Sequence, residues 1–346
     1  MASTTAKILH AVPSSTAAAD TKQVPNQNSP WRSKFLQAGC DEKMIDALFA
    51  AKVVTRYDHV YLGMTRLPAE IRKNLNVSHL CCLSGEMSAL THAHRLYDLT
   101  TNADAFDFTA LSGSLEGIKF FTETLKIKPS PLTLFYAAHS GMKNAVTYCV
   151  NDLKLDTNTK FEENSSLLHI MGLSGSVELV KYGIDDLRLD FKAVDHYQET
   201  ILHYALASGS LDLVTYCIET LGCDPIVRTT QGRTVLHSAA IGGSADTIFY
   251  IRGILAEYGS SITSDDMDND RVTAIQFAKE YVSDPEKTRE AIIALIQPLT
   301  PQAANVNSQA SISASRAANP NAPASVASAI GNADREGKAS TCCNIL

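Results

Sequence analysis

The chain has 346 residues, 45% of them hydrophobic, and a formal net charge of −7. This charge disfavours nucleic acid or an anionic membrane surface as a partner attracted by charge alone, and no apolar run approaches the 18 residues of a membrane-spanning helix. The eight cysteines form no Cys-x-x-Cys pair, so we expect a reducing compartment, no metal and no cofactor.

Residues 1–29 are rich in Ser, Thr, Ala and Asn and lack the apolar segment of a cleavable signal peptide. We expect this start to be disordered. Residues 30–77 are expected to form a helical cap on one open end of the fold, because a terminal repeat needs its apolar face covered. Within it, Pro30 to Leu36 predicts one helix. Asp41 is the expected N-cap of a second, whose apolar stripe is Met44, Ile45, Leu48 and Phe49.

Residues 67–75 carry the string Leu-Pro-x-Glu-Ile, formed by Leu67, Pro68, Glu70 and Ile71. This string resembles the opening of an F-box, a helical module that docks onto the adaptor of a cullin-type ubiquitin ligase. The match covers about five residues, and the second half lacks the Trp of that family. A competing interpretation places a degenerate first repeat just downstream, because residues 79–85 follow the frame of the later repeats.

The central feature is a set of Leu-His pairs spaced 34 residues apart, ending at His169, His203 and His237. Self-similarity at a fixed period of this length predicts a solenoid. The pattern Thr-x-Leu-His-x-Ala, with a Gly seven residues after the Leu, resembles the ankyrin repeat. The resemblance implies an all-α solenoid of stacked helix pairs with short hairpin loops over residues 78–297.

The frame continues on both sides of these repeats. Its glycines from Gly85 to Gly141 are spaced 28 residues apart, which predicts trimmed loops in the N-terminal repeats. A last repeat begins near Asp268, 39 residues after its predecessor by the Leu-to-Ile register. Residues 290–296 supply its second helix, and Pro298 ends it.

Residues 298–346 are dominated by Ala, Ser and Asn, and we expect a flexible tether. The last four residues begin with Cys343 and resemble a C-a-a-X prenylation box, which implies a host prenyltransferase and a membrane as partners. One lipid holds a protein to a membrane only marginally. Cys342 is therefore the expected site of a second lipid, a palmitoyl group.

The repeat histidines are expected to be structural, because each occupies the same place in a different repeat. In ankyrin repeats this histidine and the preceding Thr bond to backbone around the loops. A cysteine-dependent enzyme, with Cys149 or Cys217 near His139, is the weakest alternative. The acidic run from Asp265 to Asp270 lacks the Gly and Glu of a calcium loop.

The ankyrin resemblance places the loop tips along a concave face, and we expect these tips to bind a partner protein. Acidic residues outnumber basic ones there, which points to a protein partner with a basic patch. The expected binding residues are Glu162, Glu163, His196, Tyr197, Glu199, Thr230, Gln231, Arg233, Asn269 and Asp270. Asn164 and Gly232 take the place of the loop glycine of the family.

The combination of ankyrin-like repeats, an F-box-like string and a C-a-a-X end resembles effectors that intracellular bacterial pathogens deliver into host cells. It implies a non-enzymatic interaction scaffold anchored by a lipid to the cytoplasmic face of a host membrane, and secreted without a cleavable signal if the source is bacterial. The first alternative is an F-box-like substrate adaptor of a host ubiquitin ligase.

Overall fold

The computed structural model describes residues 29–67, 69–72, 74–102, 104–282 and 284–298, apart from the side chains of residues 69, 70 and 162. All of them belong to the larger of two compact units, residues 1–306. This part of the chain is helical and contains no strand, although one antiparallel bridge joins Met267 to Thr273. The expected all-α class is therefore confirmed. The disordered start and the tether were predicted for residues that lie, almost entirely, outside the described ranges.

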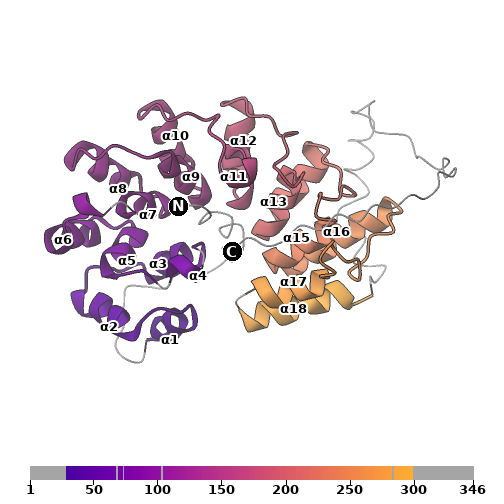
Figure 1. The fold of residues 1–346 in the computed structure, drawn as a ribbon, viewed down its shortest axis with the longest axis horizontal. Coiled ribbons are helices and arrows are strands. Elements are labelled where there is room, and N and C mark those ends of the chain that lie inside the picture. The colour runs from indigo at the N-terminus through magenta and orange to yellow at the C-terminus, as the bar shows by residue number, and fades with distance from the viewer. Residues whose placement is uncertain (1–28, 68, 73, 103, 283, 299–346) are drawn as a thin grey trace, which may run out of the picture. The chain divides into compact units, whose positions relative to one another are not determined.

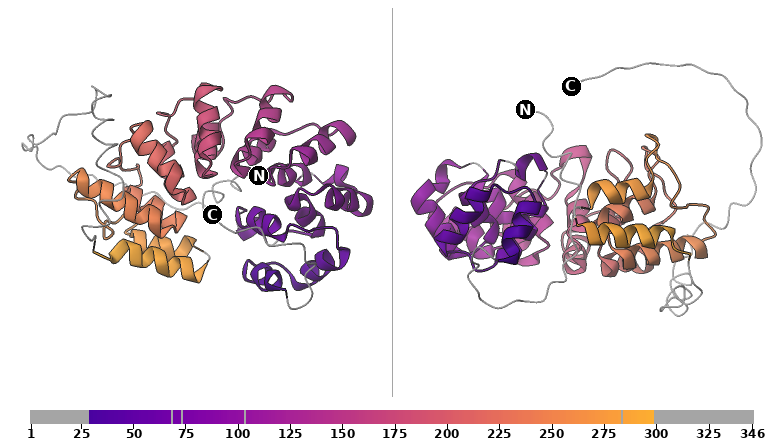
Figure 2. Two further views of the ribbon diagram at one scale, coloured as in Figure 1. Left: turned by 180° about the vertical axis from the view of Figure 1, so that it is seen from behind. Right: turned by 90° about the horizontal axis from the view of Figure 1, so that it is seen from below.

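Most helices of the described residues lie in two rows (Figure 1). The inner row holds α3 (Tyr57–Thr65) and the first helix of each of seven pairs: α5 (Val77–Ser84), α7 (Ala105–Leu111), α9 (Pro131–Ser140), α11 (Leu167–Leu173), α13 (Ile201–Ser208), α15 (Val235–Gly242) and α17 (Ala274–Tyr281). The outer row holds the second: α6 (Met87–Tyr97), α8 (Leu115–Lys119), α10 (Lys143–Asn151), α12 (Val177–Asp185), α14 (Leu211–Thr215), α16 (Ala245–Glu257) and α18 (Pro285–Ile296). From α5 onward, each inner helix packs against the next one, as the two views of Figure 2 also show.

Helix starts follow one rule along the inner row. An Asn, Ser or Thr accepts a hydrogen bond at the N-cap, and the third helical residue bonds back to the N-cap N–H. Such reciprocal caps begin six inner helices, at Asn76, Ser130, Ser166, Thr200, Thr234 and Thr273. The third position holds His in four of these helices. In α9 it holds Thr133, and in α17 it holds Gln276.

Helix ends are equally regular, because a Ser before the terminal Gly stabilises the turn into the outer helix. Ser208 shows the pattern: its hydroxyl donates to Ala205 O (2.7 Å) and accepts from Ser210 N (3.2 Å). Ser84, Ser112, Ser140 and Ser174 make the same pair of bonds. In α15 the position is Gly242, where a Cβ would lie 2.3 Å from Leu206 O. Helices α13 and α15 therefore approach too closely for a side chain.

The N-terminal segment forms α1 (Pro30–Gln37) and α2 (Glu42–Ala51). Asp41 caps α2 by accepting from Met44 N at 3.1 Å, and the four residues of the expected stripe are buried. Helix α1 packs on α3, and α2 packs on α5. Ser29 had been placed in the disordered start, but it is the buried N-cap of α1 and accepts from Trp31 N. The expected boundary therefore lies one residue too late.

Four cysteines are fully buried and pack as small apolar residues: Cys81, Cys82, Cys149 and Cys217. Among the helices that the structure describes, none combines the length and the apolar character needed to cross a membrane.

Candidate functional site

The hairpin loops that precede α11, α13, α15 and α17 are joined at their tips by backbone hydrogen bonds. His196 N donates to Glu163 O (2.6 Å), Thr230 N to Tyr197 O (2.8 Å), and Asn269 N to Gln231 O (2.8 Å). We call Glu163, His196, Tyr197, Thr230, Gln231, Asn269 and Asp270 the tip row. Because each tip is bonded to the next, the tip row is one continuous surface.

Each of the last three loops is held by a buried side chain at its base. Asp195 Oδ1 accepts from Tyr197 N and Glu199 N, both at 2.8 Å, and its Oδ2 accepts from the Tyr204 hydroxyl at 2.9 Å. Thr229 and Asp268 hold the following two loops in the same way through one side-chain oxygen. Burial raises the pKa of Asp195, and the three donors act in the opposite direction.

The repeat histidines connect these loops to the inner helices. In α11, His169 Nδ1 accepts from Ser166 N, so the ring proton is on Nε2, which lies 3.0 Å from Ala193 O. His237 bonds in the same way to Val272 O at 3.1 Å. These contacts match the structural role expected of the histidines. His203 departs from the rule, because its Nδ1 accepts from Thr200 N but its buried Nε2 has no partner.

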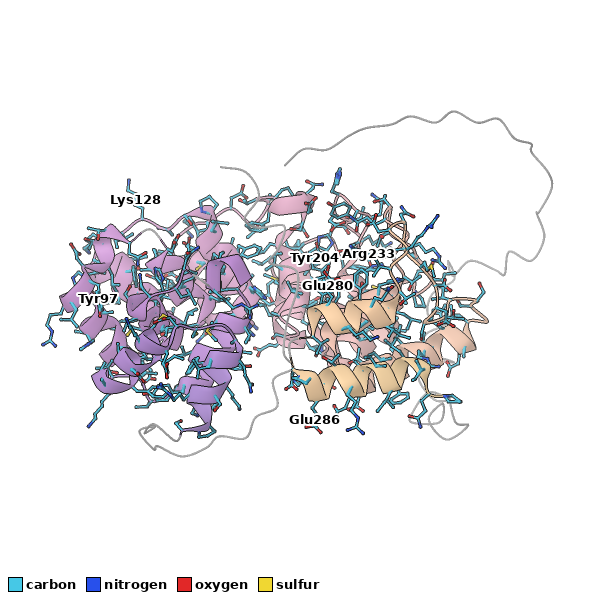
Figure 3. All side chains as sticks on the ribbon, turned by 60° about the horizontal axis from the view of Figure 1, so that its bottom comes forward. Tyr97, Lys128, Tyr204, Arg233, Glu280 and Glu286 are labelled. Atoms are coloured by element: carbon cyan, nitrogen blue, oxygen red, sulfur yellow. The ribbon has the colours of Figure 1, made fainter. Side chains whose placement is uncertain are left out.

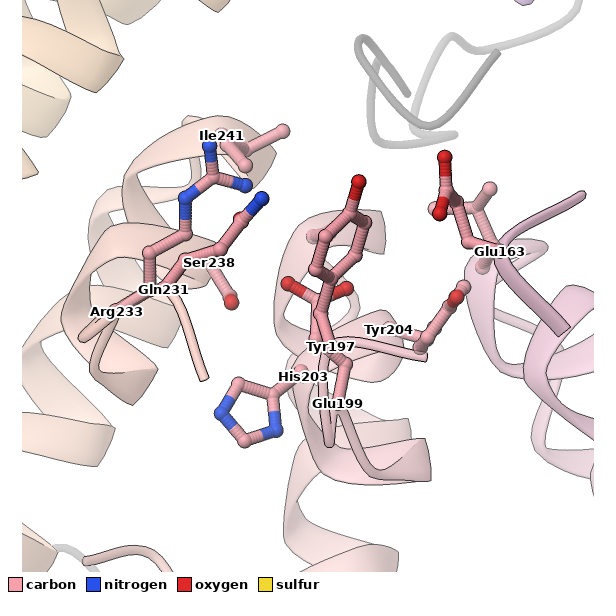
Figure 4. Close-up of a pocket in the computed structure, with 11 residues that line it drawn as sticks. Glu163, Tyr197, Glu199, His203, Tyr204, Gln231, Arg233, Ser238 and Ile241 are labelled. Atoms are coloured by element: carbon pink, nitrogen blue, oxygen red, sulfur yellow. The ribbon is translucent and has the colours of Figure 1, made fainter. Parts of the chain in front are cut away.

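A pocket of about 210 Å³ opens beside His203, between the loops and the inner helices α11, α13 and α15. Figure 4 shows Arg233 on one side, Glu163 on the other, and Tyr197 and Glu199 between them. Leu173, Ala207 and Ile241 add apolar surface. In the wider view of Figure 3, the pocket residues Tyr204 and Arg233 lie in this part of the stack, away from Tyr97 and Lys128.

The charges in the pocket are unevenly compensated. The pKa of Glu199 is raised to about 7, mainly by burial; the neighbouring Asp195 and Glu163 carboxylates also raise it, and Arg233 lowers it. The Arg233 guanidinium lies over the Phe277 ring, 4.9 Å from its centroid, and Arg233 Nε is 3.6 Å from Asp268 Oδ2. Arg233 is thus partly engaged with α17 and its loop, which leaves Glu199 without a full counter-charge.

The predicted binding residues divide into two groups. The pocket brings together Glu163, Tyr197, Glu199, Gln231 and Arg233. His196, Thr230, Asn269 and Asp270 are exposed along the tips. The backbone of Glu162 lies in a 3₁₀ turn at its tip, but its side chain is outside the described part. Sequence reasoning missed His203 and Tyr204 as pocket residues.

The F-box-like string is less accessible than its sequence suggests. Leu67 is 1% exposed and packs inside the N-terminal segment, and Ile71 lies half-buried in the short helix α4 (Ala69–Arg72). Pro68 and the side chain of Glu70 fall outside the described residues, as do Cys342 and Cys343. The buried Leu67 side chain is not available to a docking partner in this conformation.

Cys149 and Cys217, the two candidate nucleophiles, are not activated. Burial raises the pKa of Cys149 to about 12, and that of Cys217 is raised by a hydrogen bond with Cys223 and by burial. A nucleophilic cysteine needs a lowered pKa. Burial and the nearby Arg66 lower the pKa of His139 to about 3. Within the described ranges, no group of three or more His, Cys, Asp or Glu side chains is placed to hold a metal ion.

One prediction concerns the backbone of the tips. Asn164, Gln198, Gly232 and Arg271 share one loop position, and all have positive φ. Gln198→Gly is expected to raise the free energy of unfolding by about 0.5 kcal/mol, because relief of left-handed strain slightly exceeds the added freedom of the unfolded chain. Gly232→Ala is expected to lower it by about 1–2 kcal/mol, because its Cβ would also lie 2.6 Å from Asn269 Oδ1. Urea denaturation checks both signs, and equal signs would contradict this view of the tips.

A second prediction concerns Glu199. Its ordinary pKa of 4.5 rises to about 7 in the folded state, so the ionised carboxylate destabilises the fold increasingly as the pH rises between these values. Glu199→Gln is therefore expected to raise the free energy of unfolding by about 2 kcal/mol at pH 8 and by clearly less at pH 5. Urea denaturation at both pH values measures this, with the exposed Glu257→Gln as control. An equal effect at both pH values would show that Glu199 is not held in its protonated form.

Residues 134–229 match the family model described as ankyrin repeats (3 copies). The match spans α9 to the loop before α15 and therefore includes the first two tips of the tip row and most of the residues that line the pocket. The ankyrin resemblance of the sequence is confirmed for these repeats. Such repeats are typically non-enzymatic and support protein–protein interaction. A search of curated proteins finds no match.

Proposed function

We propose that this stack is a non-enzymatic scaffold that binds a partner protein along the tip row and the adjoining pocket. The observation that carries the proposal is the tip row itself: its backbone groups are bonded from loop to loop, while His196, Thr230 and Asp270 are exposed. A rigid surface of this kind loses little conformational entropy when a partner binds. The shape and the charges of the pocket and the tip row together would select one partner protein over others.

The experiment compares two matched substitutions. Thr230→Arg places a long charged side chain on an exposed tip, and Thr220→Arg places the same side chain at the exposed end of the π-helical turn Tyr216–Thr220, which continues α14 in the outer row. Full-length proteins are used to capture partners from eukaryotic cytosol, with quantification by mass spectrometry. Proteins that depend on the tip row are retained by Thr220→Arg and lost with Thr230→Arg. If the wild type and both variants capture the same set of proteins, the proposal is refuted.

We also propose a lipid anchor. In a chain whose last residue is Leu346, Cys343 stands where a prenyltransferase attaches a geranylgeranyl group, and Cys342 offers a second lipid site. The scaffold would then act at the cytoplasmic face of a eukaryotic host membrane, as an effector delivered into the cell. In transfected cells, Cys343→Ser is expected to move the protein from the membrane fraction to the cytosol. Continued sedimentation of this variant with membranes would refute the anchor.

The ligase-adaptor function ranks second. It rests on the resemblance of residues 67–75 to an F-box, and the burial of Leu67 disfavours it. Recovery of the ligase adaptor with the captured proteins, and its loss on substitution of Ile71 by Asp, would reverse this ranking. The comparison uses Leu96→Asp, on the exposed end of α6, as the matched control.

A further inference from the structure

The pocket has unsatisfied hydrogen-bonding capacity that the packing of the repeats does not use. Three of its buried polar atoms make no hydrogen bond: His203 Nε2, Gln231 Oε1 and Arg233 Nε, the last of which has only the longer ion-pair contact with Asp268. Buried polar groups in folded proteins are normally bonded, and each one left alone is unfavourable. The cavity of about 210 Å³ exceeds the roughly 10–15 Å³ that one water occupies on this measure. It therefore has room for a polar side chain of a ligand.

The charge of the pocket indicates which kind of side chain fits. Glu163 and Glu199 face the cavity, and the buried Asp195 accepts a hydrogen bond from the pocket residue Tyr204. Arg233 is the basic residue among the lining residues, and Asp268 and the Phe277 ring already engage it. Carboxyl groups thus outnumber basic side chains here; burial is the main cause of the raised pKa of Glu199, and the charges of Asp195 and Glu163 add to it. A cation would compensate this charge, whereas an anion would add to it.

The hydrogen-bond acceptors of the pocket lie on different loops. A guanidinium, whose donors point in several directions, can reach more than one of them, whereas an ammonium group is closer to a point charge. Glu163, Glu199 and Gln231 belong to three successive loops, and the Tyr197 ring stands between Glu163 and Arg233 in Figure 4. A guanidinium presents five N–H donors in one plane and stacks on aromatic rings, which an ammonium group does less well. The backbone carbonyl of the same residue, or a bridging water, supplies the acceptor that His203 Nε2–H and Arg233 Nε–H lack.

We propose that this pocket binds one arginine side chain of the partner protein, with Glu163 and Glu199 as its counter-charges and Tyr197 as its stacking surface. This inference rests on the proposed function, because it names the chemistry by which the partner is recognised. It makes Glu199 a specificity-determining residue, and it assigns His203 a ligand contact beyond its structural bond to Thr200.

The test uses a small probe, so that it does not depend on knowing the partner. N-acetyl-arginine amide is titrated into the full-length protein while NMR follows the ring signals of Tyr197 and His203. N-acetyl-citrulline amide, the neutral isostere, and N-acetyl-aspartate amide are titrated in parallel. The arginine amide is expected to give saturable shifts that the other two do not give. Glu163→Gln with Glu199→Gln should weaken its binding by about tenfold or more.

The control variant, Glu257→Gln with Glu290→Gln, changes the net charge equally at exposed sites on α16 and α18 and should leave the binding unchanged. Equal shifts with citrulline amide, preferential binding of aspartate amide, or equal weakening by the control would each overturn the proposal. Failure of the probe while Thr230→Arg still abolishes partner capture would refute the arginine pocket and leave the scaffold function standing.

Discussion

Gly242→Ala is expected to lower the free energy of unfolding by about 3 kcal/mol, at the upper end of what overpacking usually produces. The added Cβ would lie 2.3 Å from Leu206 O and 2.8 Å from Gly209 N. Both are backbone atoms of α13 and its C-terminal turn, so no side-chain rotation relieves the contact. Helices α13 and α15 must separate, and together they carry two of the four tips.

The chain offers a matched control in Gly253, which lies within α16. A Cβ there meets no atom within 4 Å. Gly253→Ala is therefore expected to stabilise the protein by about 0.5–1 kcal/mol, through helix propensity alone. Urea denaturation of both variants gives the comparison. A Gly242→Ala variant as stable as the wild type would show that α13 and α15 are not in such close contact.

Asp195→Ala is expected to lower the free energy of unfolding by a similar amount, about 3 kcal/mol, because three donors lose their acceptor at once. Two of them are the backbone N–H groups of Tyr197 and Glu199, so the substitution also loosens the second tip and the pocket beside it. The third is the hydroxyl of the buried Tyr204. Stability is measured by urea denaturation, and loosening of the tip by amide hydrogen exchange at residues 196–199.

Tyr204→Phe separates the two contributions, since it removes the hydroxyl and keeps the backbone bonds. We expect it to be destabilising by about 1 kcal/mol, with hydrogen exchange at residues 196–199 unchanged. If Asp195→Ala leaves exchange at these amides as slow as in the wild type, the loop does not depend on this carboxylate, and the account of the tip row is wrong.

The sequence was sufficient for the repeating part of the fold. The Leu-His register marks the inner helices α11, α13 and α15, because the cap, the histidine and the apolar face recur together at one period. Asp41 and its apolar stripe located α2 by the same logic of cap and periodicity. Local patterns of this kind are decided within a few residues, which is why they can be read from one chain.

Predictions from the sequence fell short where a contact joins residues that are far apart in the chain. The repeats that begin with α7 and α9 lack the Thr and His of the motif. In the structure, Asp107 occupies the histidine position of α7 and accepts from Thr133 Oγ1 at 2.7 Å and from Ser130 Oγ. The hydrogen bond between Thr133 and Asp107 joins two repeats across 26 residues. No fixed spacing in the sequence predicts it.

The pocket was only partly predictable for the same reason. The ankyrin resemblance placed the expected binding residues along a concave face, but no spacing in the sequence sets the distance between one loop and the next. The structure places five of them around one cavity. It also leaves His203 Nε2 without the carbonyl partner that His169 and His237 have. Three histidines that occupy the same place in successive repeats thus differ in what they can bind.

The central claim is that the tip row is the surface on which the partner binds. Its most direct test is site-specific photo-crosslinking, with a benzophenone amino acid placed at Thr230 on the tip row or at Thr220 on the outer row of the full-length protein. In eukaryotic cytosol, the account predicts a discrete cross-linked partner from position 230 and none from position 220. The same cross-linked protein from both positions, or from position 220 alone, would contradict it.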